Sequence, residues 1–429
     1  MFQKALVTAL FLCINLFISA QYIEIGPYSG AVSDSSAVIV YKLSLPDQEC
    51  RVEYSKDSLF RGSYFSKTYV TSGVNANYIK VALKNLEPGT KYFYQLELNG
   101  QKLERSRGKF KTFSGNSASF SFAFGNSLKS ESRRSGLKAS LDKNIMFFLH
   151  TGDLHYDNID VADIGLFRNS YQKALLRKDM SALGKETPLI YMWDDHDYGP
   201  NNSDKTAAGR LQSGKAYREC IPHYPLRSKE ENGAIYQAFT VNNVRFIMTD
   251  LRSKRDRNKQ PDNDQKTMMG EEQRAWFFEE LKKSAANHPL VIWVSSVPYT
   301  AEKRTDSWAG FTYERRLIAN FIKKHNINNV MIISGDAHSI AYNDGTNNNY
   351  SDYPGEGLFE ILAAPLDNWA TSKKGGPWTG SYIPDDGQLV YGMVEVDYTD
   401  NKAIVNFKAF DTKHQKVIEA EKHFNLIRN

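Results

Sequence analysis

The chain has 429 residues, of which 41% are hydrophobic, 24% charged and 13% aromatic, and its formal net charge is only +5. This balance excludes an intrinsically disordered chain, and the small, dispersed basic excess excludes a dedicated nucleic-acid binder. The length is that of about two or three domains, and three cysteines are too few for a disulfide scaffold.

The start of the chain has the layout of a secretory signal peptide. Lys4 precedes an almost unbroken apolar run over residues 5–18, which the small residues Ser19 and Ala20 close. The alternative is a membrane anchor, but the run is shorter than the roughly 20 residues that a spanning helix needs, and no basic stop-transfer flank follows it. We therefore expect residues 1–20 to be a signal peptide cleaved near Ala20 and the protein to be secreted, into the periplasm or outside the cell. No later segment is apolar enough to span a membrane.

Residues 21–114 have the pattern of an all-β module. Turn residues separate short alternating segments, and Asn99-Gly100 between two of them is a strong hairpin signal. The segment 86–94 resembles the tyrosine-corner region of fibronectin type III and related sandwich domains. The expected strands are 36–43, 50–54, 68–71, 77–83, 91–98 and 108–113. We interpret the module as an N-terminal β-sandwich that supports or positions the rest.

After a polar stretch at 114–119, strands alternate with helices, which predicts an α/β catalytic domain over residues 119–429. Most of its strands are continuous apolar runs, as expected for strands buried on both faces. The predicted strands are 120–124, 145–149, 188–193, 244–249, 290–294 and 330–334, the predicted helices are 271–285 and 313–325, and three further strands follow at 389–398, 403–411 and 417–424.

Three other features have ordinary structural interpretations. After signal cleavage Cys50 and Cys220 remain, in different predicted domains, and we expect two unrelated residues rather than a pair. The charge run 254–259 is most simply a solvated loop. Asn368-Trp369 lies in a Gly- and Lys-rich loop that either forms one wall of a cleft or packs internally.

The chemically informative residues follow the ends of four core strands. The motifs are Gly152-Asp153-Leu154-His155-Tyr156, Trp193-Asp194-Asp195-His196-Asp197, Asp250-Leu251-Arg252 and Gly335-Asp336-Ala337-His338. In open α/β sheets, ligands bind at the carboxyl ends of the strands, so these side chains should meet at one edge. Any single Asp here has an ordinary explanation as a turn or helix cap. Together, however, so many carboxylates would repel one another without a cation, which favours a metal site.

These motifs, in this order and spacing, resemble the alkaline phosphatase D branch of the calcineurin-like metallophosphoesterases. The Trp-Asp-Asp-His element is the most specific part, because Gly-Asp-x-x-Tyr alone is shared with purple acid phosphatases. The resemblance implies a four-layer α/β/β/α sandwich preceded by a fibronectin type III- or Ig-like β-sandwich. It also implies a centre of two or more metals.

The resemblance further implies roles for individual residues. Asp153 would bridge two metals, and Tyr156 as a phenolate, with His338, would hold the first, the usual place of Fe(III). Asp195 and Asp336 would hold a second metal, whose oxygen-rich surroundings suit Ca(II). Asp194 and Asn202 are further ligand candidates.

One position departs from the family pattern. Family members commonly carry a Cys iron ligand after Phe-Ala-x-Gly-x, whereas here residues 122–126 are followed by Ser127. Ser127 or Asn126 would offer oxygen in place of thiolate, which leaves the identity of the first metal open.

The mechanistic hypothesis is that a metal-bound hydroxide near Asp153 attacks phosphorus in line. His196 would protonate the leaving alcohol or orient the phosphate, and Arg252 would grip phosphate oxygens, its alternative being a surface salt bridge. We place Asn126, His155 and Asn202 on the substrate side; for His155 the alternative is a hydrogen bond behind the ligands, and for Asn202 a polar turn.

The sequence thus predicts a secreted, metal-dependent phosphomonoesterase or phosphodiesterase. The alternatives are a phospholipase-D-like phosphodiesterase acting on lipids or cell-wall polymers, and an inactive phosphatase-like binding protein. We expect a phosphate-ester substrate and no nucleic-acid-binding module.

Overall fold

The computed structural model describes residues 23–131, 136–141, 143–303, 305–370, 376–385 and 388–425. The expected signal peptide lies outside these ranges. Within them, no helix has the length and apolarity that crossing a bilayer requires.

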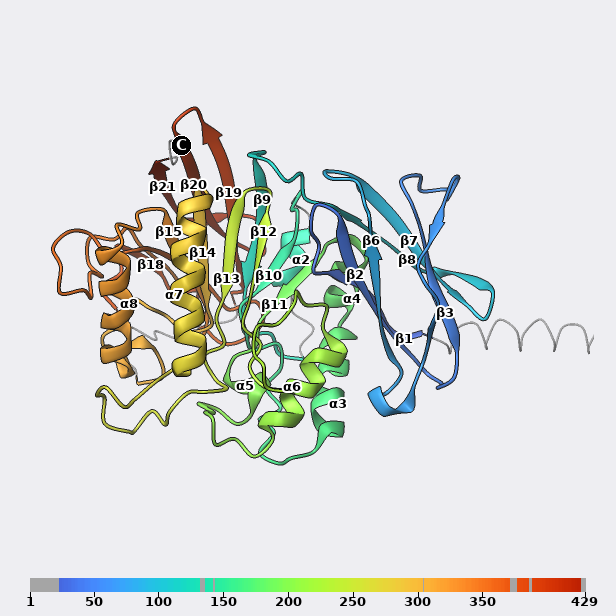
Figure 1. The fold of residues 1–429 in the computed structure, drawn as a ribbon, viewed down its shortest axis with the longest axis horizontal. Helices are drawn as coiled ribbons and strands as arrows, with labels where there is room; N and C mark the ends of the chain where they lie inside the picture. The colour runs from blue at the N-terminus through green and yellow to red at the C-terminus, as the bar shows by residue number, and fades with distance from the viewer. Residues whose placement is uncertain are drawn as a thin grey trace, which may run out of the picture.

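Two large sheets face each other in the centre of the molecule (Figure 1). Aromatic rings interlock between them, since Phe122 and Phe147 both meet the ring of Phe246 edge-on at 5.7 Å between centroids. The larger sheet has the order β21–β20–β19–β9–β10–β11–β1–β2–β6 and the smaller β12–β13–β14–β15–β17–β16–β18. The strands are β1 (Ile23–Gly30), β2 (Ser36–Leu43), β6 (Tyr78–Lys84), β9 (Phe120–Gly125), β10 (Phe148–His150), β11 (Leu189–Tyr191), β12 (Gln237–Val241), β13 (Val244–Met248), β14 (Leu290–Ser295), β15 (Val330–Ser334), β16 (Ile340–Asn343), β17 (Phe359–Ala363), β18 (Gly380–Tyr382), β19 (Val390–Thr399), β20 (Lys402–Asp411) and β21 (Lys416–Asn425).

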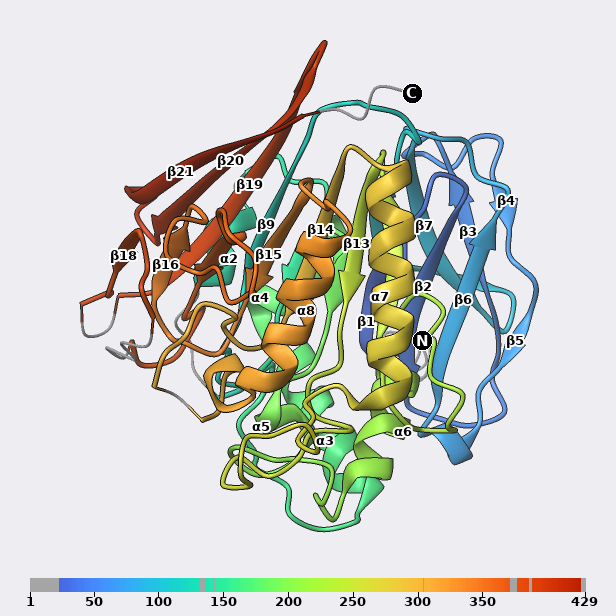
Figure 2. The ribbon, with the colours of Figure 1, turned by 60° about the vertical axis from the view of Figure 1, so that its left-hand side comes forward.

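Helices cover the outer faces of both sheets. The helices α7 (Gly270–Asn287) and α8 (Thr312–Lys324) lie on the smaller sheet (Figure 2), where their buried residues Phe277, Leu281 and Ile318 pack on Trp293. The helices α2 (Gly136–Leu141) and α4 (Lys178–Glu186) contact strands of the larger sheet. The remaining helices are α3 (Ile164–Leu175), α5 (Asp195–Tyr198) and α6 (Arg210–Cys220), with short 3₁₀ turns η1 (Gly73–Asn75) and η2 (Trp308–Gly310).

The N-terminal strands are divided between two sheets, one of which is the larger central sheet. A third sheet, β4–β3–β7–β8 with β5 beside β3, faces β1, β2 and β6, which themselves belong to the larger sheet; its strands are β3 (Glu49–Ser55), β4 (Tyr64–Phe65), β5 (Tyr69–Val70), β7 (Lys91–Leu98) and β8 (Gln101–Lys111). The junction is the parallel pairing of Gly30 with Leu189. A Cβ on Gly30 would lie 2.5 Å from the carbonyl oxygen of Leu189, so this close approach requires glycine.

The mixed α/β architecture with large sheets confirms the coarse fold prediction. Most predicted strands lie within one to three residues of observed ones, but β1, β4, β12, β16, β17 and β18 were not predicted. Cys50 and Cys220 are both buried and unpaired, as expected. The solvated-loop interpretation of the charge run is wrong at Arg255, whose side chain is 0% exposed.

Parallel strands set up the site. The strands β9, β10 and β11 run parallel, as do β13, β14, β15 and β17. Their carboxyl ends therefore point to one edge, where the loops after β10, β11, β14 and β15 meet.

Candidate metal centre

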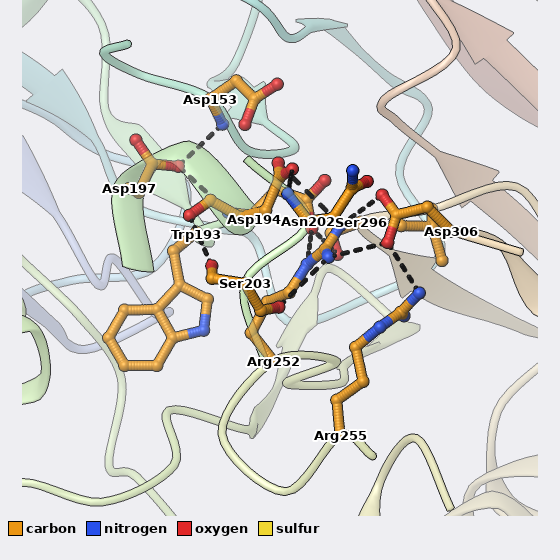
Figure 3. A network of polar contacts seen from close by, with 12 residues as sticks. Asp153, Trp193, Asp194, Asp197, Asn202, Ser203, Arg252, Arg255, Ser296 and Asp306 are labelled. Carbon is orange, nitrogen blue, oxygen red and sulfur yellow. Dashed lines mark hydrogen bonds and ion pairs between the residues drawn. The ribbon is translucent and has the colours of Figure 1, made fainter. Parts of the chain in front are cut away.

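The loops after β10 and β11 are locked together by one carboxylate. Asp197 accepts the backbone N–H groups of Asp153 at 2.7 Å and of Asp194 at 3.0 Å, as Figure 3 shows, and it also binds the N–H groups of Leu154 and His155. The Asp153 loop comes so close that a Cβ on Gly152, whose φ is +114°, would lie 2.5 Å from the Cβ of Asp194. Gly152 and Asp197, both in the sequence motifs, therefore fix the two loops against each other.

Two of the predicted metal ligands and the predicted catalytic histidine converge. One ligand atom each of Asp153, Asp195 and His196 lies within 4.8 Å of the others. Tyr156 joins them, because its hydroxyl donates to Oδ2 of Asp153 at 2.9 Å and lies 3.1 Å from Nε2 of His338. The loops after β10, β11 and β15 thus deliver oxygen and nitrogen ligands to one place.

The carboxylates of this cluster hold oxygen atoms without hydrogen-bond partners. Oδ1 of Asp153, Oδ2 of Asp194 and Oδ1 of Asp195 are buried and accept no hydrogen bond. Burial, with the neighbouring charges of Asp195 and Asp194, raises the pKa of Asp153 well above its usual value. Unsatisfied buried carboxylate oxygens are costly in a protein interior, and hard cations are bound by such oxygens. The donor set present therefore fits metal ions.

The backbone around these ligands is strained. Asp153, Asp336 and His338 have φ angles of 57°, 63° and 51°, in the left-handed region that non-glycine residues seldom adopt. Such residues persist where the surroundings fix them and concentrate at functional sites. Asp336 and His338 are both buried, at 6% and 7% exposed, in the loop after β15.

Ser127 and Asn126 lie in the floor of the centre rather than at an open surface. Both are buried, the Ser127 hydroxyl donates to Oδ1 of Asn126 at 2.7 Å, and the Asn126 amide donates to Thr151. The backbone N–H of Ser127 also donates to the carbonyl of Gly152 at 3.2 Å. Ser127 is therefore beside the metal-binding loop. Asn126 was expected to contact substrate, but it is buried and its amide bonds to Thr151 and Ser127 instead.

Arg252 has other partners than the expected phosphate. Its side chain is 0% exposed. Its Nε donates to Oδ1 of Asp194 at 2.6 Å, and Nη1 donates to Asp306 at 3.0 Å (Figure 3). Asp306 was not predicted, because it lies 54 residues away in a segment without a motif. Because these carboxylates surround the guanidinium, it lies behind the ligands and not at the open edge.

A second arginine completes this buried network. Nη2 of Arg255 donates to Asp306 at 2.7 Å, and Asn258 donates to the same oxygen at 3.0 Å. Burial opposes ionisation of Asp306, but the charges of Arg252 and Arg255 hold its pKa below the usual value. Likewise, burial is outweighed at Asp195, where Arg252 and then His196 hold the pKa low.

The two loop histidines have different surroundings. His196 is half-buried, its ring lies 4.2 Å from that of Tyr156, and its Nδ1 lies 2.7 Å from Oδ1 of Asn158. His155 is fully buried against Tyr171, and burial lowers its pKa to about 4. His196 is thus placed at the rim. His155 lies inside, where neither ring nitrogen has a hydrogen-bond partner, so neither the expected substrate contact nor the alternative hydrogen bond behind the ligands is seen.

Asn202 contributes its backbone. Its N–H donates to Oδ2 of Asp195 at 2.6 Å while its side chain is exposed. This contact leaves Oδ1 of Asp195 as the oxygen that faces the cluster. Ser296, after β14, acts similarly on Asp194, to whose Oδ1 it donates at 2.7 Å.

Comparisons with known proteins show the family and the fold. Residues 135–407 match the family model of the PhoD-like phosphatases, and residues 17–114 match that of the PhoD-like phosphatase N-terminal domain. Alkaline phosphatase D of Bacillus subtilis (strain 168) is 26% identical over 337 residues, a match that covers 67% of this chain but only 58% of that relative. A solved structure of PhoD superposes with a TM-score of 0.76 at 19% identity, covers 93% of this chain and 92% of its own, and shows the shared fold.

Proposed function

The chain belongs to the PhoD-like phosphatase family, and from this premise we propose that it hydrolyses phosphate esters with the help of bound metal ions. The observation that carries the proposal is the set of buried oxygens on Asp153, Asp194 and Asp195 that accept no hydrogen bond. An inactive binding protein would have no reason to keep these carboxylates buried together at a cost in stability. The retained Tyr156 and His338 support an intact centre.

We assign the ligands to two sites. Tyr156, His338 and Asp153 would hold the first metal, and Asp153, Asp195, Asp194 and Asp336 the second. The first site suits Fe(III) and the second, built of carboxylate oxygens, Ca(II). Since Ser127 stands beside Tyr156 where relatives carry a thiolate, the first site here has only oxygen and nitrogen donors.

Bound cations would acidify a water molecule and neutralise charge on the phosphoryl oxygens. The protein's own part is to fix the ligand oxygens and to move protons. Oδ1 of Asn158 can only accept, so Nδ1 of His196 donates to it and keeps its own proton. Nε2 has a second proton to transfer only when the ring is the doubly protonated imidazolium, and this is the form that the proposed step uses. We propose that Nε2 gives this proton to the leaving oxygen as the phosphorus–oxygen bond breaks.

Arg252 is proposed as a positioning residue instead of a phosphate clamp. It binds Oδ1 of Asp194 and turns the other oxygen, Oδ2, to the metal cluster. Its charge also keeps Asp195 ionised, and a carboxylate must be ionised to bind metal. Asp306 holds the guanidinium in place from the far side.

The finer features of the sequence prediction are part of this proposal. We propose a catalytic domain over residues 119–429 with the four-layer metallophosphoesterase sandwich, a fibronectin type III- or Ig-like module over 21–114, and secretion after cleavage near Ala20. The two facing sheets with outer helices support the first of these.

The test is metal analysis of purified protein combined with hydrolysis of p-nitrophenyl phosphate and bis(p-nitrophenyl) phosphate. Bound metal with hydrolysis of either ester supports the proposal, and faster diester cleavage favours the phosphodiesterase. Asp153→Asn, which keeps the shape of the side chain, should lose both metal and turnover. A protein without metal and without hydrolysis would be the binding protein instead.

A further inference from the structure

An exposed tryptophan stands beside the candidate metal centre. All six tryptophans lie in the described ranges, and Trp369 alone among them is exposed, at 67%. We propose that its indole is a stacking platform for the leaving group, so that the enzyme prefers phosphate esters whose leaving group carries a ring; this rests on the proposed function.

The backbone ties Trp369 to a proposed metal ligand. Its carbonyl oxygen lies 2.8 Å from Nδ1 of His338, whose Nε2 lies 3.1 Å from the Tyr156 hydroxyl. One imidazole ring therefore separates the main chain of Trp369 from the phenol oxygen. We place the leaving group of a phosphate held at this centre next to the indole.

The segment that carries the indole is firmly anchored. Leu128 and Asp367 form a parallel bridge, and the N–H of Lys129 donates to the carbonyl of Asp367 at 3.1 Å. Beneath them Arg177, 4% exposed at its side chain, pairs with Asp367 at 2.9 Å and donates to the carbonyl of Lys129. The indole thus projects from a fixed two-strand ribbon that also contains Ser127.

One side of the ring already has an occupant. The ammonium of Lys129 lies 4.1 Å from the indole centroid, a cation–π contact that orients the ring. A singly exposed hydrophobic side chain is ordinary in itself, so what distinguishes this ring is its position beside the proposed ligand His338 and its fixed orientation. Aromatic rings stack on such a face, and sugar rings place their C–H groups on it, so the shared ligand chemistry is a ring.

The test compares three substrates on four proteins. Benzyl phosphate carries an aromatic ring, glucose 6-phosphate a sugar ring and glycerol phosphate no ring. The proteins are the wild type, Trp369→Ala, Trp369→Phe and the control Tyr64→Ala, which removes a 57% exposed aromatic on β4 of the third sheet.

In Trp369→Ala the KM for a ring-bearing substrate should rise about three- to tenfold, while kcat and all constants for glycerol phosphate stay unchanged. Trp369→Phe should restore most of the loss. A rise for benzyl phosphate alone assigns the platform to aromatic groups, and a rise for both assigns it to rings in general. Non-hydrolysable benzylphosphonate should also change the fluorescence of the wild type but not that of Trp369→Phe.

Equal effects on all three substrates, or none, would overturn the platform while leaving the phosphatase intact. If the wild type hydrolyses none of the three nor a nitrophenyl diester, the proposed function itself fails, and the platform with it.

Discussion

Nε of Arg252 donates a 2.6 Å hydrogen bond to Oδ1 of Asp194, and neither side chain is more than 1% exposed. A buried arginine among carboxylates is the counter-charge that lets them stay together before metal binds. Replacing it by Gln would leave Asp194 buried without its cation and Asp306 with Arg255 alone.

We expect Arg252→Gln to lower the free energy of unfolding of the metal-free protein by about 3–5 kcal/mol. Urea denaturation of dialysed protein measures this. The matched control is Arg61→Gln, which breaks an ion pair whose arginine is 78% exposed and should cost less than about 1 kcal/mol. Similar losses in the two variants would show that Arg252 does not balance the cluster.

Asp153→Asn should have opposite effects on stability and activity. Because burial and neighbouring carboxylates raise the pKa of Asp153, its ionised form destabilises the metal-free fold at neutral pH. The amide should therefore raise unfolding free energy by about 1 kcal/mol or more, and abolish turnover. With metal added, the wild type should become more stable than Asp153→Asn, because metal binds tightly only to the wild-type fold. Asp264→Asn, in an exposed loop, is the control; a destabilised metal-free Asp153→Asn would contradict the argument.

The strand ends were predictable because each apolar run and the polar motif after it are neighbours in the sequence. The burial of Arg252 and Arg255 was not, because it depends on Asp306, which has no motif and arrives from beyond β14. A charged side chain is almost never fully buried without a partner of opposite charge, and a partner that is distant in the chain cannot be identified from the sequence.

The junction of the N-terminal strands with the larger sheet was equally hidden. The strand β1 contains the breaker pair Gly26-Pro27, and its contact with β11 rests on the single close approach at Gly30. Neither feature follows from alternation of polar and apolar residues. By contrast β2, β7 and β15 were predicted at their observed bounds because the pattern is local.

His196→Ala should lower kcat for an alkyl phosphate about 100-fold or more. Metal content should stay near that of the wild type, because the carboxylates and Tyr156 still hold the ions. Asn158→Ala, which removes only the partner of Nδ1, should give a smaller loss. Loss of metal from His196→Ala would make the residue a ligand, and unchanged turnover would refute its role.

Ser127→Cys should raise the iron content of the purified protein, since a buried thiolate beside Tyr156 is a softer, stronger ligand than a hydroxyl. A visible absorption band from thiolate-to-iron charge transfer would mark the bond. Ser284→Cys, also buried but on α7, is the control and should gain neither. If the iron content and the absorption spectrum of Ser127→Cys are the same as those of the wild type, the first metal does not lie next to residue 127.

Acid should destabilise the protein partly through His150. This side chain is fully buried on β10, neither ring nitrogen has a hydrogen-bond partner, and burial with the nearby charge of Arg177 lowers its pKa to about 3. The unfolded side chain titrates near pH 6.5, so the unfolded state takes up the proton first as the pH falls. The free energy of unfolding therefore decreases below that pH and is unaffected by His150 above it. At pH 5 this lowers the free energy of unfolding by about 2 kcal/mol relative to neutral pH.

His150→Phe should remove this contribution, so that the difference in unfolding free energy between pH 7.5 and pH 5 shrinks by about that amount. The carboxylates whose pKa is raised, such as Asp153, change stability in the opposite direction, but they are common to both proteins and cancel in the comparison. His423→Gln, at an exposed position of β21, controls for loss of any histidine. An unaltered pH dependence in His150→Phe would mean that His150 reaches a proton-accepting partner in the folded protein.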